Sequence, residues 1–158
     1  MKRILTATAI AAALTAGNAQ AGNTSGTFTV NVTLTSACTL SAVTAVDFAY
    51  TSLQAAVANA TGGGFSVSCT NTLPYTFGLQ AGNGAATPPG AATIAVTDNA
   101  VNLNYSLGLS AAGATGNGAA QAFSVTGTMA GSQAGTCAAA SCTNGAATNK
   151  IHTLIVNY

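Results

Sequence analysis

The chain of 158 residues carries only five formally charged side chains, three basic and two acidic, which is 3% of its residues. An average soluble domain carries roughly 25%. Nucleic-acid phosphates are bound by several lysine or arginine side chains, so this composition excludes a basic nucleic-acid surface. It also excludes the high net charge of disordered chains. The length predicts one folded domain, and a hydrophobic content of 49% is enough to form its core.

The first 21 residues have the three parts of a secretory signal peptide. A positively charged start is followed by an uncharged apolar run at 4–16 and by a small-x-small cleavage pattern that ends at Ala21. The apolar run is shorter than the roughly 18 residues that a membrane-spanning helix needs. We therefore expect cleavage after Ala21 and a secreted mature chain, residues 22–158, without a membrane span.

The mature chain contains four cysteines, and export would bring them into an oxidising compartment in which disulfides form. They are Cys38, Cys69, Cys137 and Cys142, and they allow three pairings. We favour Cys38–Cys69 together with Cys137–Cys142, because the second pair is close enough in sequence to close a small loop. A zinc site is the alternative reading. The spacing lacks paired CxxC motifs, however, and the chain has a single histidine, so we expect no metal and no cofactor.

Alternation of apolar and polar residues is the main structural signal of the mature chain, and it is typical of strands with one buried face. The apolar members of the alternating segments are Phe28, Val30, Val32 and Leu34; Phe65, Val67 and Cys69; Tyr75, Phe77 and Leu79; Leu103, Tyr105, Leu107 and Leu109; Phe123 and Val125; and Leu154, Val156 and Tyr158. Segments rich in glycine and proline separate most of them and predict turns. Only residues 53–60 show a weak helical pattern. Short strands separated by turns predict an all-β antiparallel sandwich.

The polar positions of the alternating segments hold threonine, serine and asparagine. Natural sheets often protect exposed strand edges with charged side chains, especially lysine. The long N-terminal segment at 27–35 is β-branched and uncharged, so in a monomer its edges would favour aggregation. This pattern favours the hypothesis that strand edges of the protein are occupied by a partner.

The side chains available disfavour catalysis. The mature chain contains no glutamate or arginine, and the candidates for acid–base chemistry are Asp47, Asp98, Lys150 and His152. Asp47 lies on or beside a predicted strand, and Asp98 lies in a sequence typical of turns. Serine-hydrolase and phosphate-loop motifs are missing. We therefore expect no catalytic residues, and we read the aromatic side chains as core residues in preference to a sugar-binding platform.

Several stretches, taken in order, resemble the spore coat protein U domain family, which supplies the subunits of archaic chaperone–usher pili. They are Phe28-Thr29-Val30-Asn31-Val32-Thr33-Leu34, Ala37-Cys38-Thr39-Leu40-Ser41, Val46-Asp47-Phe48-Ala49-Tyr50, Phe65-Ser66-Val67-Ser68-Cys69-Thr70-Asn71, Pro74-Tyr75-Thr76-Phe77-Gly78-Leu79, Val101-Asn102-Leu103-Asn104-Tyr105-Ser106-Leu107 and Leu154-Ile155-Val156-Asn157-Tyr158. The resemblance covers nearly the whole mature chain. Each stretch alone has low specificity, whereas the ordered set behind a signal peptide is fairly specific.

The resemblance implies an incomplete immunoglobulin-like sandwich that lacks its last strand and is completed by a donor strand from another subunit. Residues 22–35 would be the donor extension and 36–158 the pilin domain. The donor side chains would be Gly26, Phe28, Val30, Val32 and Leu34, and the groove edge recognised by a chaperone would include Leu154, Val156 and Tyr158. This exchange is a form of β-strand addition.

The resemblance also implies partners and a location. The partners would be identical or related pilin subunits, a periplasmic chaperone and an outer-membrane usher. The product would be an extracellular pilus that supports surface attachment and biofilm formation. Two other functions stay open for this fold: a secreted monomeric sugar-binding or adhesive module, and a spore or outer coat protein.

Overall fold

The computed structural model describes residues 22–158, so the expected signal peptide at 1–21 lies outside the described residues. The chain divides into two units, the second of which is Leu34–Tyr158. In the first unit, the described residues 22–33 form no helix and no strand. We call residues 22–33 the extension and residues 34–158 the domain.

The domain consists of β-strands and one turn of 3₁₀ helix, η1 (Asn144–Ala146). The strands are β1 (Cys38–Leu40), β2 (Val46–Asp47), β3 (Ala58–Asn59), β4 (Thr61–Gly62), β5 (Gly64–Cys69), β6 (Pro74–Ala81), β7 (Thr93–Thr97), β8 (Asn104–Leu109), β9 (Gly113–Thr115), β10 (Gln121–Met129) and β11 (His152–Asn157). The prediction of an all-β fold is confirmed. The weak helical pattern at 53–60 was misleading, because this stretch forms turns and the short strand β3.

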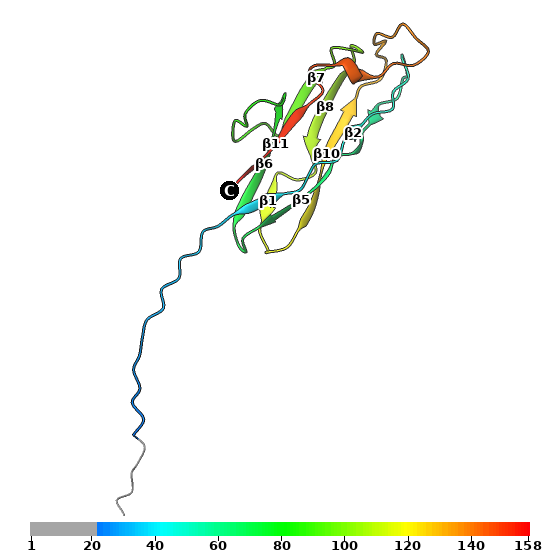
Figure 1. Cartoon of the computed structure of the whole chain (residues 1–158). Helices are drawn as coiled ribbons and strands as arrows, with labels where there is room; N and C mark the ends of the chain where they lie inside the picture. The colour runs from blue at the N-terminus through cyan, green and yellow to red at the C-terminus, as the bar shows by residue number, and fades with distance from the viewer. Residues whose placement is uncertain (1–21) are drawn as a thin grey trace, which may run out of the picture. The chain divides into compact units, whose positions relative to one another are not determined.

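The strands form two main antiparallel sheets (Figure 1). The larger sheet has the order β1-β5-β10-β8-β7, with β3 also pairing with β10. The smaller sheet has the order β11-β6-β9, and β2 pairs separately with β4. This architecture is consistent with an immunoglobulin-like sandwich, in which two sheets pack face to face over one core.

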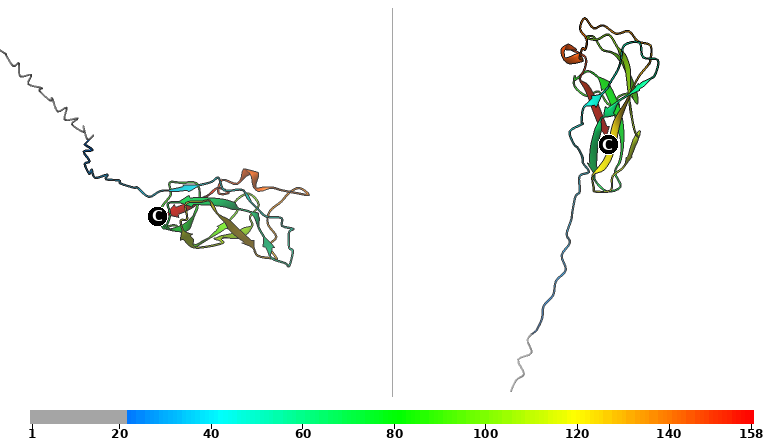
Figure 2. Two further views of the ribbon diagram at one scale, coloured as in Figure 1. Left: turned by 90° about the horizontal axis from the view of Figure 1, so that it is seen from below. Right: turned by 90° about the vertical axis from the view of Figure 1, so that its right-hand side faces the viewer.

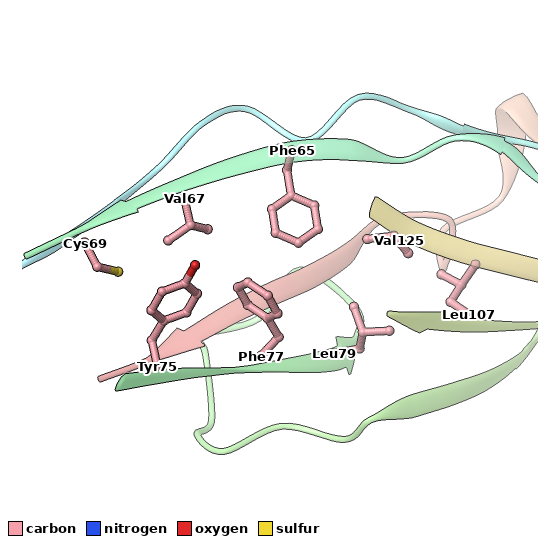
Figure 3. Packing of buried hydrophobic residues seen from close by; sticks show 8 residues of the cluster. All are labelled: Phe65, Val67, Cys69, Tyr75, Phe77, Leu79, Leu107 and Val125. Carbon is pink, nitrogen blue, oxygen red and sulfur yellow. The ribbon is translucent and has the colours of Figure 1, made fainter. Parts of the chain in front are cut away.

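The core lies between β5 of the larger sheet and β6 of the smaller one. Figure 3 shows Phe65 and Val67 pointing from β5 toward Tyr75 and Phe77 on β6. These side chains follow the period of two predicted from the sequence, because alternate residues of a strand face the same side. The ring of Phe77 lies 4.8 Å from that of Phe123 and 5.3 Å from that of Phe65, measured between centroids. Edge-to-face contacts of this kind stabilise a core beyond the burial of area alone.

A loop at 82–90 covers the outer side of β11. Ile155 breaks the apolar alternation of β11, yet it is one of the most buried residues of the strand, at 5% exposure. The Thr153 hydroxyl donates to the carbonyl of Gly82, and the Asn157 side chain donates to that of Pro89. The loop therefore shields Ile155, and the opposite side of β11 carries Leu154 and Val156, which pack on the core.

Two disulfides join the cysteine pairs that the sequence favours. Cys38–Cys69 links the paired strands β1 and β5, and Cys137–Cys142 closes a loop between β10 and β11. The first encloses a much longer stretch of chain than the second, with sequence separations of 31 and 5. In the chain-entropy model, a longer enclosed loop gives greater stabilisation of the folded state.

Replacing both cysteines of a pair by alanine should reveal this difference. We expect the Cys38/Cys69 change to lower the free energy of unfolding by roughly 3–4 kcal/mol, and the Cys137/Cys142 change by about 2 kcal/mol. Urea denaturation of the two double variants measures both values. Equal losses would show that loop length does not govern the stabilisation.

A candidate strand-binding groove

One edge of β11 is unpaired within residues 22–158. β11 pairs with β6 along its whole length, from His152 opposite Ala81 to Asn157 opposite Thr76, and with no other named strand. Residues 37–47 form the facing edge, across a gap from β11. Their backbone bonds to β4, β5 and the residues next to these strands, for example through the hydrogen bond from the N–H of Thr44 to the carbonyl of Gly64. An unpaired edge presents a row of backbone donors and acceptors that can bind another strand.

The gap between these two edges is a groove of about 640 Å³. One wall is formed by residues 43–48 with Tyr50, and the other by 151–154 at the start of β11. Its floor includes the core side chains Leu79, Leu107 and Val125. In the first wall, Val46 and Phe48 are half-buried and alternate with exposed residues, so they face inward. An apolar floor between two strand edges is suited to an extended segment with apolar side chains on one face.

The groove has a polar end at the start of β11, lined by Asp98, Thr143, Asn144, Lys150 and His152. Asp98 is 2% exposed. Its carboxylate accepts hydrogen bonds from the backbone N–H groups of Ala100 and Val101 and from the side chain of Asn144, at 2.8–3.0 Å. The carboxylate thus holds the turn after β7 against the segment before β11.

Further hydrogen bonds join the same two segments. The Asn99 side chain donates to the Thr148 hydroxyl, and the Asn149 side chain donates to the carbonyl of Thr97. The ammonium group of Lys150 donates to the carbonyl of Gly145. The side chains at the polar end are therefore held in place by hydrogen bonds. Among the described residues, no buried side-chain polar atom lacks a hydrogen-bond partner.

Burial alone would raise the pKa of Asp98. The hydrogen bonds from Val101, Asn144 and Ala100, together with the positive charge of Lys150, outweigh this effect and hold the pKa below its usual value. A carboxyl group whose pKa is lower in the folded than in the unfolded state stabilises the fold above its unfolded pKa of about 3.9. The stabilisation is lost as the pH falls below that value toward the folded pKa.

We therefore expect Asp98→Asn to reduce the acid sensitivity of the fold. At pH 6 the variant should unfold more easily by roughly 1.5–3 kcal/mol, because hydrogen bonds to a charged group are lost. Near pH 3 the difference from the natural chain should shrink. Denaturation at both pH values measures it, and Asp47→Asn, at an exposed carboxylate, is the matched control. A difference that does not depend on pH would contradict this role of Asp98.

His152 connects the two sheets at the polar end. Its Nε2 atom lies 2.9 Å from the hydroxyl of Tyr105 on β8, and Gly82 N–H donates to its Nδ1 atom. Because Nδ1 accepts, the neutral ring carries its proton on Nε2 and donates to Tyr105. Burial lowers the pKa of His152, while burial and the negative charge of Asp98 raise that of Tyr105.

The structure places the residues named from the sequence as follows. Leu154 lines the groove, whereas Val156 and Tyr158 do not, although Val156 packs against the core. Asp47, Asp98 and Lys150, the three charged residues of the described chain, all line the groove. Neither this convergence nor the role of Asn144 was predicted from the sequence. The alternation of Val46, Phe48 and Tyr50 was the available signal for the first wall.

A family model for the spore coat protein U domain matches residues 24–151. The chain belongs to this family. The resemblance stated from the sequence is thereby confirmed. Neither a curated protein nor a solved structure matches the chain.

Proteins with a spore coat protein U domain are structural components of pili and coats on the cell exterior, and they include chaperone–usher pilin subunits. In the domain of this chain, the groove and the free edge of β11 are the features suited to binding another chain. Among residues 22–158, no helix has the length and apolar character needed to cross a membrane.

Proposed function

We propose that this chain is a structural pilus subunit that polymerises by donor-strand exchange after export through a periplasmic chaperone and an outer-membrane usher. Each copy would insert its donor segment, residues 22–35, into the groove of another copy. The pilus would lie outside the cell and support surface attachment and biofilm formation. The observation that carries the proposal is the apolar groove beside the unpaired edge of β11, in a chain whose N-terminal segment alternates in the way an inserted strand requires.

The N-terminal segment has the features of a donor. Phe28, Val30, Val32 and Leu34 are 70–86% exposed, and threonine or asparagine lies between them. The segment forms no strand despite its period of two, because a strand needs a neighbour for its backbone hydrogen bonds. Burial of the four apolar side chains in a groove would contribute roughly 6–12 kcal/mol before the ordering of the segment is counted.

The same pairing between copies produces a filament. The donor segment and the groove are different surfaces of one chain, so each contact is head-to-tail and leaves a free groove and a free donor for the next copy. Head-to-tail contacts that do not close into a ring build open filaments. Strand edges that no charged side chain protects would then serve as the sites at which copies assemble.

Deletion of residues 23–34 tests the proposal. The truncated chain should still bind the chaperone, because the groove is intact, but it should form no SDS-resistant multimers. Electrophoresis without boiling, beside the full-length chain, measures the multimers. If the truncated chain forms the same ladder as the full-length chain, donor exchange through this segment is wrong, and a coat protein or a monomeric adhesive module becomes the better interpretation.

A further inference from the structure

We propose that the polar end of the groove sets the register of the inserted strand, so that Ser36 of one copy lies against Lys150 of the copy that receives it. This inference rests on the proposed function, because it concerns the same groove and the same donor. The inference assigns a role to Asp98 and Lys150, the two charged residues at the polar end of a groove with an apolar floor. The steps are the direction of the inserted strand, its register and the chemistry of the contact.

The direction follows from where two chain segments lie in the domain. Cys38 pairs with Cys69, just before the turn between β5 and β6, and Asn157 pairs with Thr76, just after that turn. The start of β1 and the end of β11 therefore lie at the same end of the domain, and Figures 1 and 2 show the C-terminus close to β1.

An incoming donor is followed in its own chain by a whole domain, which needs space where the donor leaves the groove. A donor parallel to β11 would leave where the receiving copy has its own residues 34–37. An antiparallel donor leaves at the polar end, beside Lys150, at the opposite end of β11 from residues 34–37. All pairs of named strands in the domain are also antiparallel. The donor is therefore antiparallel to β11.

The register follows from the period of two. Leu154 and Val156 face the core, so His152 and Tyr158 continue the same side of β11. The donor has four apolar residues on one face, from Phe28 to Leu34. Leu34 opposite His152 is the register that places Val32 opposite Leu154 and Val30 opposite Val156, with Phe28 opposite Tyr158 just after the strand. A slip by one residue would turn every donor side chain away from the groove.

A slip by two residues leaves the apolar side chains of the donor facing the groove, but it gives poorer contacts with the receiving copy. A slip in one direction carries Val30 as well as Phe28 past Asn157, the last residue of β11. A slip in the other direction places Leu34 against Lys150, so that an apolar side chain displaces water from an ammonium group without replacing its hydrogen bonds.

In the favoured register, the next inward residue of the donor is Ser36, which lies opposite Lys150. Serine is small and has a hydroxyl group, so it can accept a hydrogen bond from the ammonium group of Lys150. Both residues are exposed in the described chain, and the polar end around Lys150 is held in place by the buried Asp98. The receiving copy thus meets four apolar side chains and then a small polar one.

A charge-exchange cycle between positions 36 and 150 in the full-length chain tests this contact. Ser36→Lys should reduce the amount of SDS-resistant polymer by about tenfold, because two ammonium groups would meet at a partly buried site. Lys150→Glu alone should change it by less than about threefold. The double variant should return to within about threefold of the natural chain, since the two charges then attract.

Thr35→Lys is the matched control, because residue 35 faces away from the groove in the proposed register. Lys150→Glu should not rescue it. The register would be overturned if Ser36→Lys and Lys150→Glu reduced the polymer independently of each other. It would also be overturned if Lys150→Glu restored the polymer of Thr35→Lys as well as that of Ser36→Lys. The deletion of residues 23–34 separates this outcome from failure of the proposed function: if the deletion abolishes polymers while the cycle shows no coupling, only the register is wrong.

Discussion

A chain with Val30→Asp is expected to form no SDS-resistant multimers. In the proposed contact, Val30 lies at the centre of the donor's apolar face and opposite Val156, whose side chain packs on the core. A carboxylate placed there loses its water without gaining a partner, which costs several kcal/mol. We expect multimer formation to fall by roughly a hundredfold or more, since about 2.7 kcal/mol corresponds to that factor. Electrophoresis without boiling measures it.

Asn31→Asp is the control for the same charge on the opposite face of the donor. Residue 31 would point away from the groove, so its carboxylate would stay hydrated, and multimers should form nearly as in the natural chain. Both changes lie in the extension, outside the domain, and should leave the stability of the domain unchanged. Equal loss of multimers in the two variants would contradict the proposed face of the donor.

The second large effect concerns the core. Phe77→Ala is expected to lower the free energy of unfolding of the domain by roughly 3–5 kcal/mol, because the cavity removes contacts with several rings at once. Phe77 is 7% exposed, and its ring contacts those of Phe65, Tyr75 and Phe123. Urea denaturation measures the loss, which is a large part of the stability of a typical domain.

Val57→Ala is the matched control for the core change. Val57 is an apolar residue with 56% exposure, and its truncation should change the free energy of unfolding by no more than about 0.5 kcal/mol. A loss below about 1 kcal/mol for Phe77→Ala would show that the rings repack around the missing side chain.

The strands that were predicted best are those with one face in the core. Alternation identified β5, β6, β8, β10 and β11, because the inward residues of these strands are mostly apolar and the outward ones, apart from Ile155, are mostly polar or small. The same rule missed β7, in which Ile94 and Val96 alternate with threonine and alanine in a short run. It placed no strand at β4, and at β2 it indicated only that Asp47 lies on or beside a strand; each has two residues and is defined by its pairing alone.

The donor segment shows the opposite case. Residues 28–34 have the clearest alternation in the chain, yet they form no strand in the described structure. Alternation records which face of a segment is suited to burial, and this preference is local. Strand formation also requires a second strand edge, and an edge is a property of the assembled fold or of a partner.

The sequence by itself determined the all-β class, the family, the favoured cysteine pairing and the poor supply of catalytic side chains. The family rests on the resemblance of the ordered stretches, and the other three follow from composition, spacing or period. Only the tertiary structure decided which edges stay open and that Asp47, Asp98 and Lys150 line the same groove. These charges lie far apart along the chain, and the antiparallel pairing of strands from distant parts of the sequence brings them together. The five charges that excluded many functions at the outset thus leave three in the described chain, all beside the one groove that we propose for assembly.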